Sequence, residues 1–143
     1  MTDNRTTITR FWDTLYARDW GGLAGFFTDD ATYTDVCSPA DDIAVGPDQI
    51  LRRLRLGIEP ISGYDHNLKL MVVDGDVVVT EHSETWRWRD GEEVTLPFLT
   101  VQELREGRIT RWYDYWDLGT LMNAAPAWWI EHVMVGWADK PSS

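Results

Sequence analysis

Residues 77–104, VVVTEHSETWRWRDGEEVTLPFLTVQEL, contain the alternation that decides the fold. Successive side chains of a strand point to opposite faces, and the segment Val77 to Arg89 alternates in this way. Asp90-Gly91 is typical of a tight hairpin turn, which joins this strand to a second one at Glu93 to Leu104. The first strand then presents on one face His82, Glu84, Trp86 and Trp88. We therefore expect a hairpin in which ionisable groups lie beside buried tryptophans.

The same period of two continues on both sides of this hairpin, whereas the first part of the chain has helical spacing. The expected strands are Tyr64 to Val73, Val77 to Arg89, Glu93 to Leu104 and Arg108 to Asp117, preceded by a strand at Ala31 to Cys37. The expected helices are Thr6 to Arg18, a short one from Asp19, one from Gly46 that ends before Glu59, and Leu118 to Trp137 interrupted by Pro126. Helices followed by an antiparallel meander predict one α+β domain over residues 1–143, with helices on one face of a cone-shaped sheet.

The composition narrows the class of partner. A net charge of −11 and a pI near 4.5 disfavour nucleic acids and anionic membranes, because both would repel the protein. The N-terminus lacks a signal-peptide pattern and no apolar run is long enough to span a bilayer, so we expect a cytoplasmic protein. Phosphate loops, nucleophile elbows and zinc-binding patterns are also missing from the sequence, so no cofactor and no metal is expected.

Ionisable residues recur on strand faces that are otherwise apolar. His66 shares the predicted face of its strand with Leu68, Leu70 and Val72, and Asp114 lies between two tryptophans. Burying an unpaired charge costs several kcal/mol, so such groups must be paired, neutral or open to a cavity. Carboxyl groups held together in apolar surroundings cannot all ionise, which is how a general acid and a general base arise from one residue type. The groups expected to share a pocket are Asp35, His66, His82, Glu84 and Asp114.

The order of elements and the segment GRITRWYDYWDL, Gly107 to Leu118, resemble the SnoaL-like branch of the NTF2-like superfamily, most closely its limonene-1,2-epoxide hydrolase group. The resemblance covers nearly the whole chain. It implies a cone-shaped antiparallel sheet wrapped around the N-terminal helices, with a C-terminal helix closing the pocket. It also implies cofactor-independent acid-base chemistry on a small hydrophobic molecule such as a terpenoid, steroid or polyketide. Epoxide opening, by water or by an internal hydroxyl, is the activity it favours.

The epoxide hydrolase pattern assigns roles to residues of this chain. Asp114 matches the base that activates water, and Tyr33 matches a tyrosine that holds the water. The chain departs from the pattern elsewhere, with Asp35 in place of an asparagine, His82 in place of an arginine, and Glu84 in place of the acid aspartate. We expect Glu84 to be the acid and His82 to bridge the carboxylates, charged when the pH is low enough. The expected walls are Trp86, Phe98, Trp116 and Leu121, with His66 as a wall residue or second polar contact.

Other activities of the superfamily stay open. Asp35 lies near the general base of ketosteroid-isomerase-like members, although Phe11 occupies the place of their oxyanion-binding tyrosine. His66 and His82, on consecutive strands, resemble the histidines of scytalone-dehydratase-like members. A third alternative is a domain that binds a small ligand without turnover. The outer sheet face, which includes Val101, Tyr113 and Tyr115, predicts a homodimer through the sheet.

Overall fold

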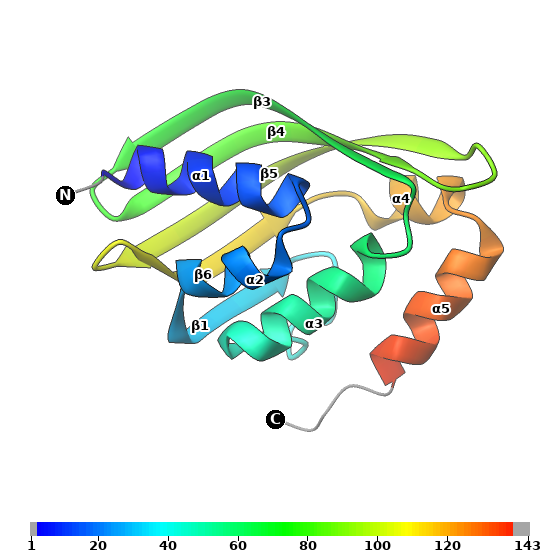
Figure 1. The fold of residues 1–143 in the computed structure, drawn as a ribbon, viewed down its shortest axis with the longest axis horizontal. Helices are drawn as coiled ribbons and strands as arrows, with labels where there is room; N and C mark the ends of the chain where they lie inside the picture. Colours follow the sequence, from blue (N-terminus) through cyan, green and yellow to red (C-terminus); the bar gives the residue numbers. More distant parts are fainter. Residues whose placement is uncertain (1–2, 139–143) are drawn as a thin grey trace.

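A six-stranded curved sheet wraps around helices in the computed structural model, which describes residues 3–138 (Figure 1). In chain order the elements are α1 (Asn4–Tyr16), α2 (Trp20–Leu23), a 3-10 turn η1 (Ala24–Phe26), β1 (Phe27–Asp35), β2 (Ala44–Val45), α3 (Gly46–Ile58), β3 (Gly63–Asp74), β4 (Val77–Arg87), β5 (Glu93–Arg105), β6 (Arg108–Tyr115), α4 (Leu118–Ala124) and α5 (Ala127–Ala138). The predicted α+β class and the order of its long elements are confirmed. The short strand β2 had no counterpart in the prediction.

The sheet is mixed, which corrects the prediction of a wholly antiparallel sheet. Its strand order is β2-β1-β6-β5-β4-β3, and the meander from β3 to β6 is antiparallel as expected. Strand β1 instead pairs in parallel with β6. A parallel pair needs a long connection, and here the connection comprises α3 and the meander itself. Alternation along the chain reveals strands but not which distant strand each one joins.

Helix α1 fills the concave face of the sheet. Its first turn is capped by Asp3, whose Oδ1 accepts a hydrogen bond from the backbone N–H of Thr6 at 2.7 Å. Ile8, Phe11 and Leu15 follow at helical spacing and are at most 2% exposed. Burying side chains of this size stabilises the fold by about 2 kcal/mol each. The same helix ends at the pocket, where it contributes aromatic side chains.

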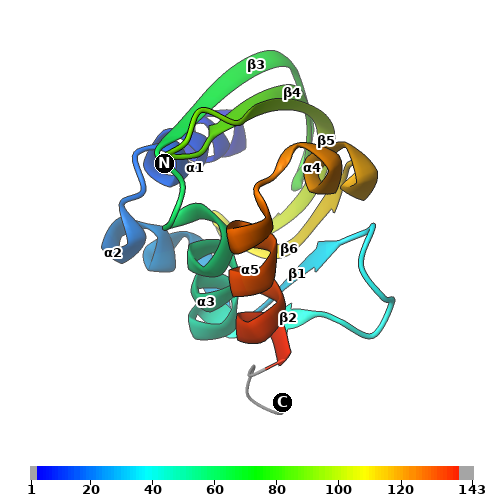
Figure 2. The same cartoon turned by 90° about the vertical axis from the view of Figure 1, so that its right-hand side faces the viewer.

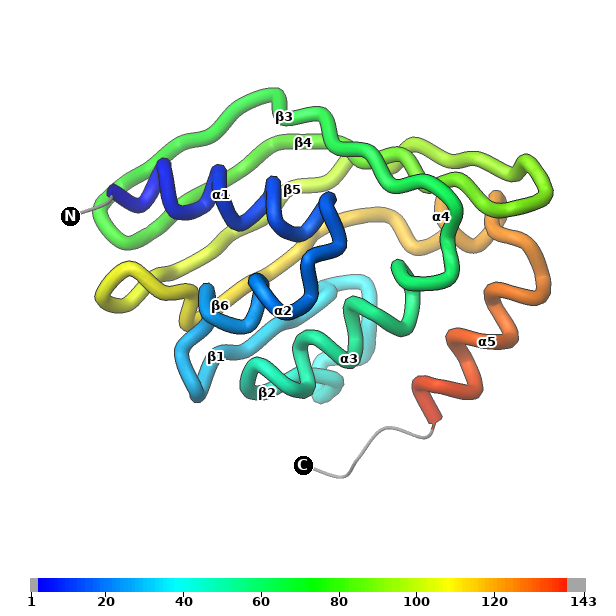
Figure 3. The backbone as a smooth tube through the Cα atoms, in the orientation of Figure 1, coloured from blue at the N-terminus to red at the C-terminus, as the bar shows by residue number. Residues whose placement is uncertain are grey.

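Strand β3 contains a bulge that corrects the predicted face of its second half. Leu68 pairs with His82 but Leu70 pairs with Glu81, which lies on the other face of β4. The extra residue reverses the alternation, and the tube of β3 steps sideways midway along the strand (Figure 3). Leu70 and Val72 therefore point outward, at 56% and 50% exposed, instead of sharing the inner face with the residues before the bulge.

Helices α4 and α5 lie at the open end of the curved sheet (Figure 2). Trp129 of α5 is 3% exposed, and its Nε1 donates to the backbone carbonyl of Gly57 on α3 at 2.9 Å. Its ring also meets the edge of Trp86 at 5.5 Å. The C-terminal helix thus closes the pocket, as the resemblance implied. Among the described residues, no helix has the length and apolarity that crossing a membrane requires.

Candidate active site

A cavity of about 340 Å³ lies at this end of the sheet, between α1, α3, α4, α5 and the inner faces of the strands. Most of its wall is aromatic or aliphatic, with a few carboxyl and phenol groups, as in typical small-ligand pockets. The predicted residues that line it are Tyr33, Asp35, Glu84, Trp86, Phe98, Asp114, Trp116 and Leu121. His66 and His82 are not among the lining residues.

Asp35 and Asp114 face each other across the pair of strands that the sequence did not predict. They are direct partners in the parallel register of β1 and β6. The hydroxyl of Tyr33 lies between them, 3.0 Å from Oδ1 of Asp35 and 3.3 Å from Oδ2 of Asp114. A phenol has one proton to donate, so it cannot serve two carboxylates at once. The hydrogen bonds of all three groups are satisfied when the two carboxyls share one proton, because the phenol then donates to one carboxyl and accepts from the other.

Further donors fix one oxygen of each carboxyl. Trp116 Nε1 donates to Oδ1 of Asp35 at 3.0 Å. Oδ1 of Asp114 accepts two hydrogen bonds, from Thr100 Oγ1 at 2.6 Å and from Trp112 Nε1 at 2.7 Å. The remaining oxygen of Asp114, Oδ2, is the one beside the phenol. Proton transfer to and from Asp114 is therefore directed to Oδ2.

Burial sets the protonation of these groups. Desolvation, followed by the negative charge of Asp35, raises the pKa of Asp114 well above its usual value. Desolvation also raises the pKa of Asp35, although the hydrogen bonds from Trp116 and Tyr33 oppose the shift. The two carboxyls therefore titrate as a pair, in which a proton bound by one is shared with the other.

Glu84 lies on another wall of the same cavity, on β4. Its Oε2 accepts a hydrogen bond from the hydroxyl of Tyr16 at 2.8 Å. Desolvation raises the pKa of Glu84, while hydrogen bonds from Tyr64 and Tyr16 favour the charged form and only partly offset the burial. A raised pKa keeps a carboxyl protonated to higher pH, which suits the predicted role of Glu84 as an acid.

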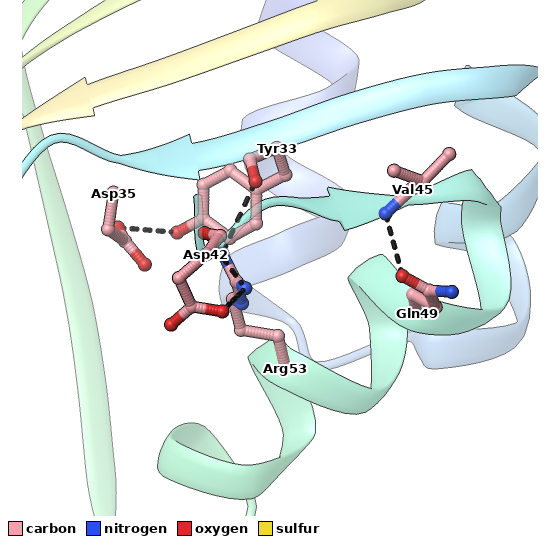
Figure 4. Close-up of polar contacts among 6 residues, drawn as sticks. All are labelled: Tyr33, Asp35, Asp42, Val45, Gln49 and Arg53. Atoms are coloured by element: carbon pink, nitrogen blue, oxygen red, sulfur yellow. Dashed lines mark hydrogen bonds and ion pairs between the residues drawn. The ribbon is translucent and has the colours of Figure 1, made fainter. Parts of the chain in front are cut away.

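Arg53 of α3 supplies a positive charge to this site that the sequence analysis missed (Figure 4). Its side chain is 10% exposed, pairs with Asp42 at 3.0 Å, and donates to the backbone carbonyl of Tyr33 at 3.2 Å. Its charge favours the ionised form of Asp35, though less than burial disfavours it. Its position three residues after the buried Ile50 placed it on the inner face of the helix, and that spacing was the available signal.

The two histidines lie behind the cavity wall. His82 is 1% exposed, and its ring nitrogens are each 2.8 Å from a partner, His66 Nε2 and Thr100 Oγ1. Desolvation lowers the pKa of His82 to about 3 and that of His66 to about 4. Both rings are neutral at physiological pH, so the expectation that a charged His82 replaces an arginine is wrong. His82 lies behind Asp114, and it does not bridge Asp114 to Glu84 as expected.

Over residues 3–138, the structure contains no group of three or more His, Cys, Asp or Glu side chains arranged to hold a metal ion. The polar lining of the cavity includes carboxyl and phenol groups, in largely aromatic and aliphatic surroundings. These groups can accept a proton on one wall and donate one on another.

Residues 8–112 match the model of the SnoaL-like domain. The chain belongs to the SnoaL-like domain family. Solved structures agree with its NTF2-like fold. A candidate SnoaL-like polyketide cyclase from Shewanella putrefaciens is 21% identical, with a TM-score of 0.75 over 87% of this chain and 86% of that one. An LEH-like epoxide hydrolase from Mycobacterium tuberculosis is 21% identical, with a TM-score of 0.69 over 93% and 90%.

A third similar structure is a protein with a ketosteroid isomerase-like fold from Catenulispora acidiphila, in complex with trimethylamine. It is 21% identical, with a TM-score of 0.72 over 82% of this chain and 90% of that one. At such identities the likeness establishes the SnoaL-like fold, whereas the activity has to be argued from the site.

Proposed function

We propose that this SnoaL-like protein is a cofactor-independent acid-base enzyme that opens the epoxide of a small hydrophobic molecule, by water or by an internal hydroxyl. The observation that carries this proposal is the hydrogen-bonded set of Asp35, Tyr33 and Asp114 in an aromatic cavity, with the acid Glu84 on another wall. The likeness to an LEH-like epoxide hydrolase and to a candidate polyketide cyclase supports this class of reaction. Terpenoids, steroids and polyketides fit the apolar lining.

In the proposed reaction, the negatively charged aspartate pair takes a proton from the attacking water or hydroxyl while Tyr33 holds that oxygen in place. The oxygen bonds to an epoxide carbon, and the bond from that carbon to the epoxide oxygen breaks. Glu84 donates its proton to the epoxide oxygen, so no free alkoxide forms. The pair has then gained one proton and Glu84 has lost one, and transfer through solvent restores both. The pair acts as the base, since its single charge is shared by Asp35 and Asp114.

Replacing Glu84 with glutamine tests the acid. We expect the wild-type protein to consume limonene 1,2-epoxide or styrene oxide, measured by gas chromatography, and Glu84→Gln to lower kcat by about two orders of magnitude or more. Glutamine can still accept the hydrogen bond from Tyr16, so the fold should persist. Glu131→Gln, on the exposed surface of α5, is the matched control and should keep full activity. Recovery of an unmodified ligand, with no turnover of epoxides, would instead indicate a binding domain.

An isomerase is the second candidate, because Tyr16 and Glu84 form a hydrogen-bonded pair that could stabilise an oxyanion. Asp35 would then be the base that moves a proton on a ketone. The dehydratase alternative requires direct acid-base catalysis by His66 and His82. It has no support, because neither residue lines the cavity. The same variant separates the candidates. Glutamine retains an N–H donor for an oxyanion, so Glu84→Gln would keep much of any ketosteroid isomerisation while losing epoxide opening.

We also propose that the outer sheet face mediates a homodimer. Neighbouring strands align side chains in two rows across this face. The register joins the apolar residues Val72, Val79, Val101 and Tyr113 in one row, and Leu70, Leu99 and Tyr115 with the charged Glu81 in the other. Leu70 and Tyr115 are 56% and 43% exposed. Apolar surface of this kind in a contiguous patch is typical of an interface between subunits.

Placing a charge in the middle of this face should weaken the dimer. Leu99, on β5, is 40% exposed, and we expect Leu99→Glu to convert a dimer to a monomer in sedimentation velocity at micromolar concentration. Val135→Glu, at an exposed apolar position on α5, is the matched control and should remain dimeric. A wild-type monomer at this concentration would contradict the proposal.

A further inference from the structure

A line of hydrogen-bonded side chains runs across four neighbouring strands and ends at Asp114. His66 on β3 bonds to His82 on β4 at 2.8 Å, and His82 bonds to Thr100 on β5 at 2.8 Å. Thr100 then donates to Oδ1 of Asp114 on β6 at 2.6 Å. Three of these four residues lie outside the cavity, and the proposed reaction does not use them.

The protons in this line can be placed by elimination. Thr100 has one hydroxyl proton, and it points to the carboxyl oxygen of Asp114. The hydroxyl must therefore accept at its other side, so Nε2 of His82 carries a proton and donates it to Thr100. A neutral imidazole has one N–H, which leaves Nδ1 of His82 as an acceptor for the Nε2–H of His66. Every donor in the line then points toward Asp114.

Packing holds the rings in this arrangement. The ring of His82 stacks on Phe98 with 3.4 Å between centroids and meets the edge of Trp12 at 4.7 Å. His66 stacks on Tyr16 at 4.3 Å, with an interplanar angle of 5°. These contacts oppose rotation of either ring, so the packing favours this one arrangement of the line.

We propose that His66, His82 and Thr100 are positioning residues that act through Asp114. Together with Trp112, they hold Oδ1 of Asp114 as a permanent acceptor and confine proton exchange to Oδ2, which faces Tyr33. This inference rests on the proposed function in one respect, that Asp114 belongs to the base. The charged or titratable groups around the line and its end are Asp13 and Tyr16 on α1, Tyr33 and Asp35 on β1, Arg53 on α3, Tyr64 on β3 and Glu84 on β4.

Two substitutions of Thr100 test the line. Thr100→Val keeps the shape but removes the donor to Asp114, whereas Thr100→Ser retains the hydroxyl. Carbon-13 NMR of labelled aspartate carboxyls follows the titration of Asp114. We expect its midpoint to rise by about one pH unit in Thr100→Val, because a hydrogen bond to the charged form is lost, and to stay near the wild-type value in Thr100→Ser. The acid limb of the kcat profile should move with it, while KM stays within about twofold.

Nitrogen-15 NMR of the imidazole rings supplies a readout on the unmodified protein. We expect both His66 and His82 to be neutral Nε2–H tautomers at pH 7, and His82 to lose this single tautomer in Thr100→Val. A His82 ring protonated at Nδ1 alone, or an unchanged titration of Asp114 in Thr100→Val, would overturn the proposal. These measurements need no turnover. If the protein opens no epoxide but shows the expected tautomers and titration, the proposed function is wrong. The positioning of Asp114 by the line of side chains is then still supported.

Discussion

Replacing Asp114 with asparagine is expected to lower kcat for epoxide opening by about three orders of magnitude, because the base loses the carboxyl oxygen Oδ2 that accepts the proton beside Tyr33. The fold should persist. The asparagine carbonyl can accept the hydrogen bonds that Thr100 and Trp112 donate to Oδ1, and its amide nitrogen can donate to Tyr33 in place of Oδ2. Tyr33 then donates to Asp35, so every polar group keeps a partner.

Steady-state rates and the far-ultraviolet circular dichroism spectrum check this prediction together. Asp41→Asn, at an exposed position in the loop after β1, is the matched control and should change neither. An Asp114→Asn protein with native circular dichroism and full activity would exclude Asp114 from the base. Loss of activity together with loss of the native spectrum would contradict the expectation that the asparagine retains the hydrogen bonds.

Strand periodicity was sufficient to predict most of the polar site. Glu84, Trp86 and Asp114 line the cavity because a period of two specifies faces whenever the strand is regular. The same rule failed where β3 is irregular, since one extra residue at Lys69 moves Leu70 to the other face. A bulge is hard to recognise in the sequence when the residues before and after it are both apolar, because the alternation hardly changes.

Contacts between distant elements could not be predicted from local pattern. The parallel pairing of β1 with β6 brings Asp35 beside Asp114, and α3 brings Arg53 to the same wall. The neutral state of the His82 ring could not be predicted from local pattern either, because it depends on how completely the ring is desolvated. Which groups share a face follows from the chain itself, whereas which groups share a proton follows from the packing of elements against one another.

The balance of charge in the cavity explains why its carboxyl groups hold protons more tightly than exposed ones do. Asp35, Glu84 and Asp114 all have a raised pKa, and in each case the largest cause is burial. Arg53 supplies a guanidinium nearby, but Asp42 is its ion-pair partner at 3.0 Å. A cavity with more carboxyls than available cations lowers its free energy by keeping protons. The raised pKa values therefore favour a protonated carboxyl, which the proposed reaction uses as its acid.

The free energy of unfolding is expected to fall as the pH rises above the range in which the unfolded carboxyls and histidines titrate, which is the second large effect. A carboxyl whose pKa is raised in the folded state binds a proton there that the unfolded chain has already released. Its contribution to stability is complete below the unfolded pKa and is lost as the pH rises through the folded pKa. Asp114, whose pKa is raised well above its usual value, and Asp35 and Glu84, whose pKa values are also raised, all act in this direction. Chemical denaturation at a series of pH values from neutral upward measures the decline.

The histidines affect the free energy of unfolding in the opposite direction, because their contribution is lost at low pH. The pKa of His82 falls from its usual 6.5 to about 3 in the folded protein, so its contribution is present above pH 6.5 and is lost as the pH falls toward 3. That loss is on the order of 4 kcal/mol for His82. Asp114→Asn removes one of the raised carboxyls without touching the histidines, so it should flatten the alkaline decline and leave the acid decline in place. A variant that loses stability above pH 7 as steeply as the wild type would show that Asp114 does not hold a proton in the folded state.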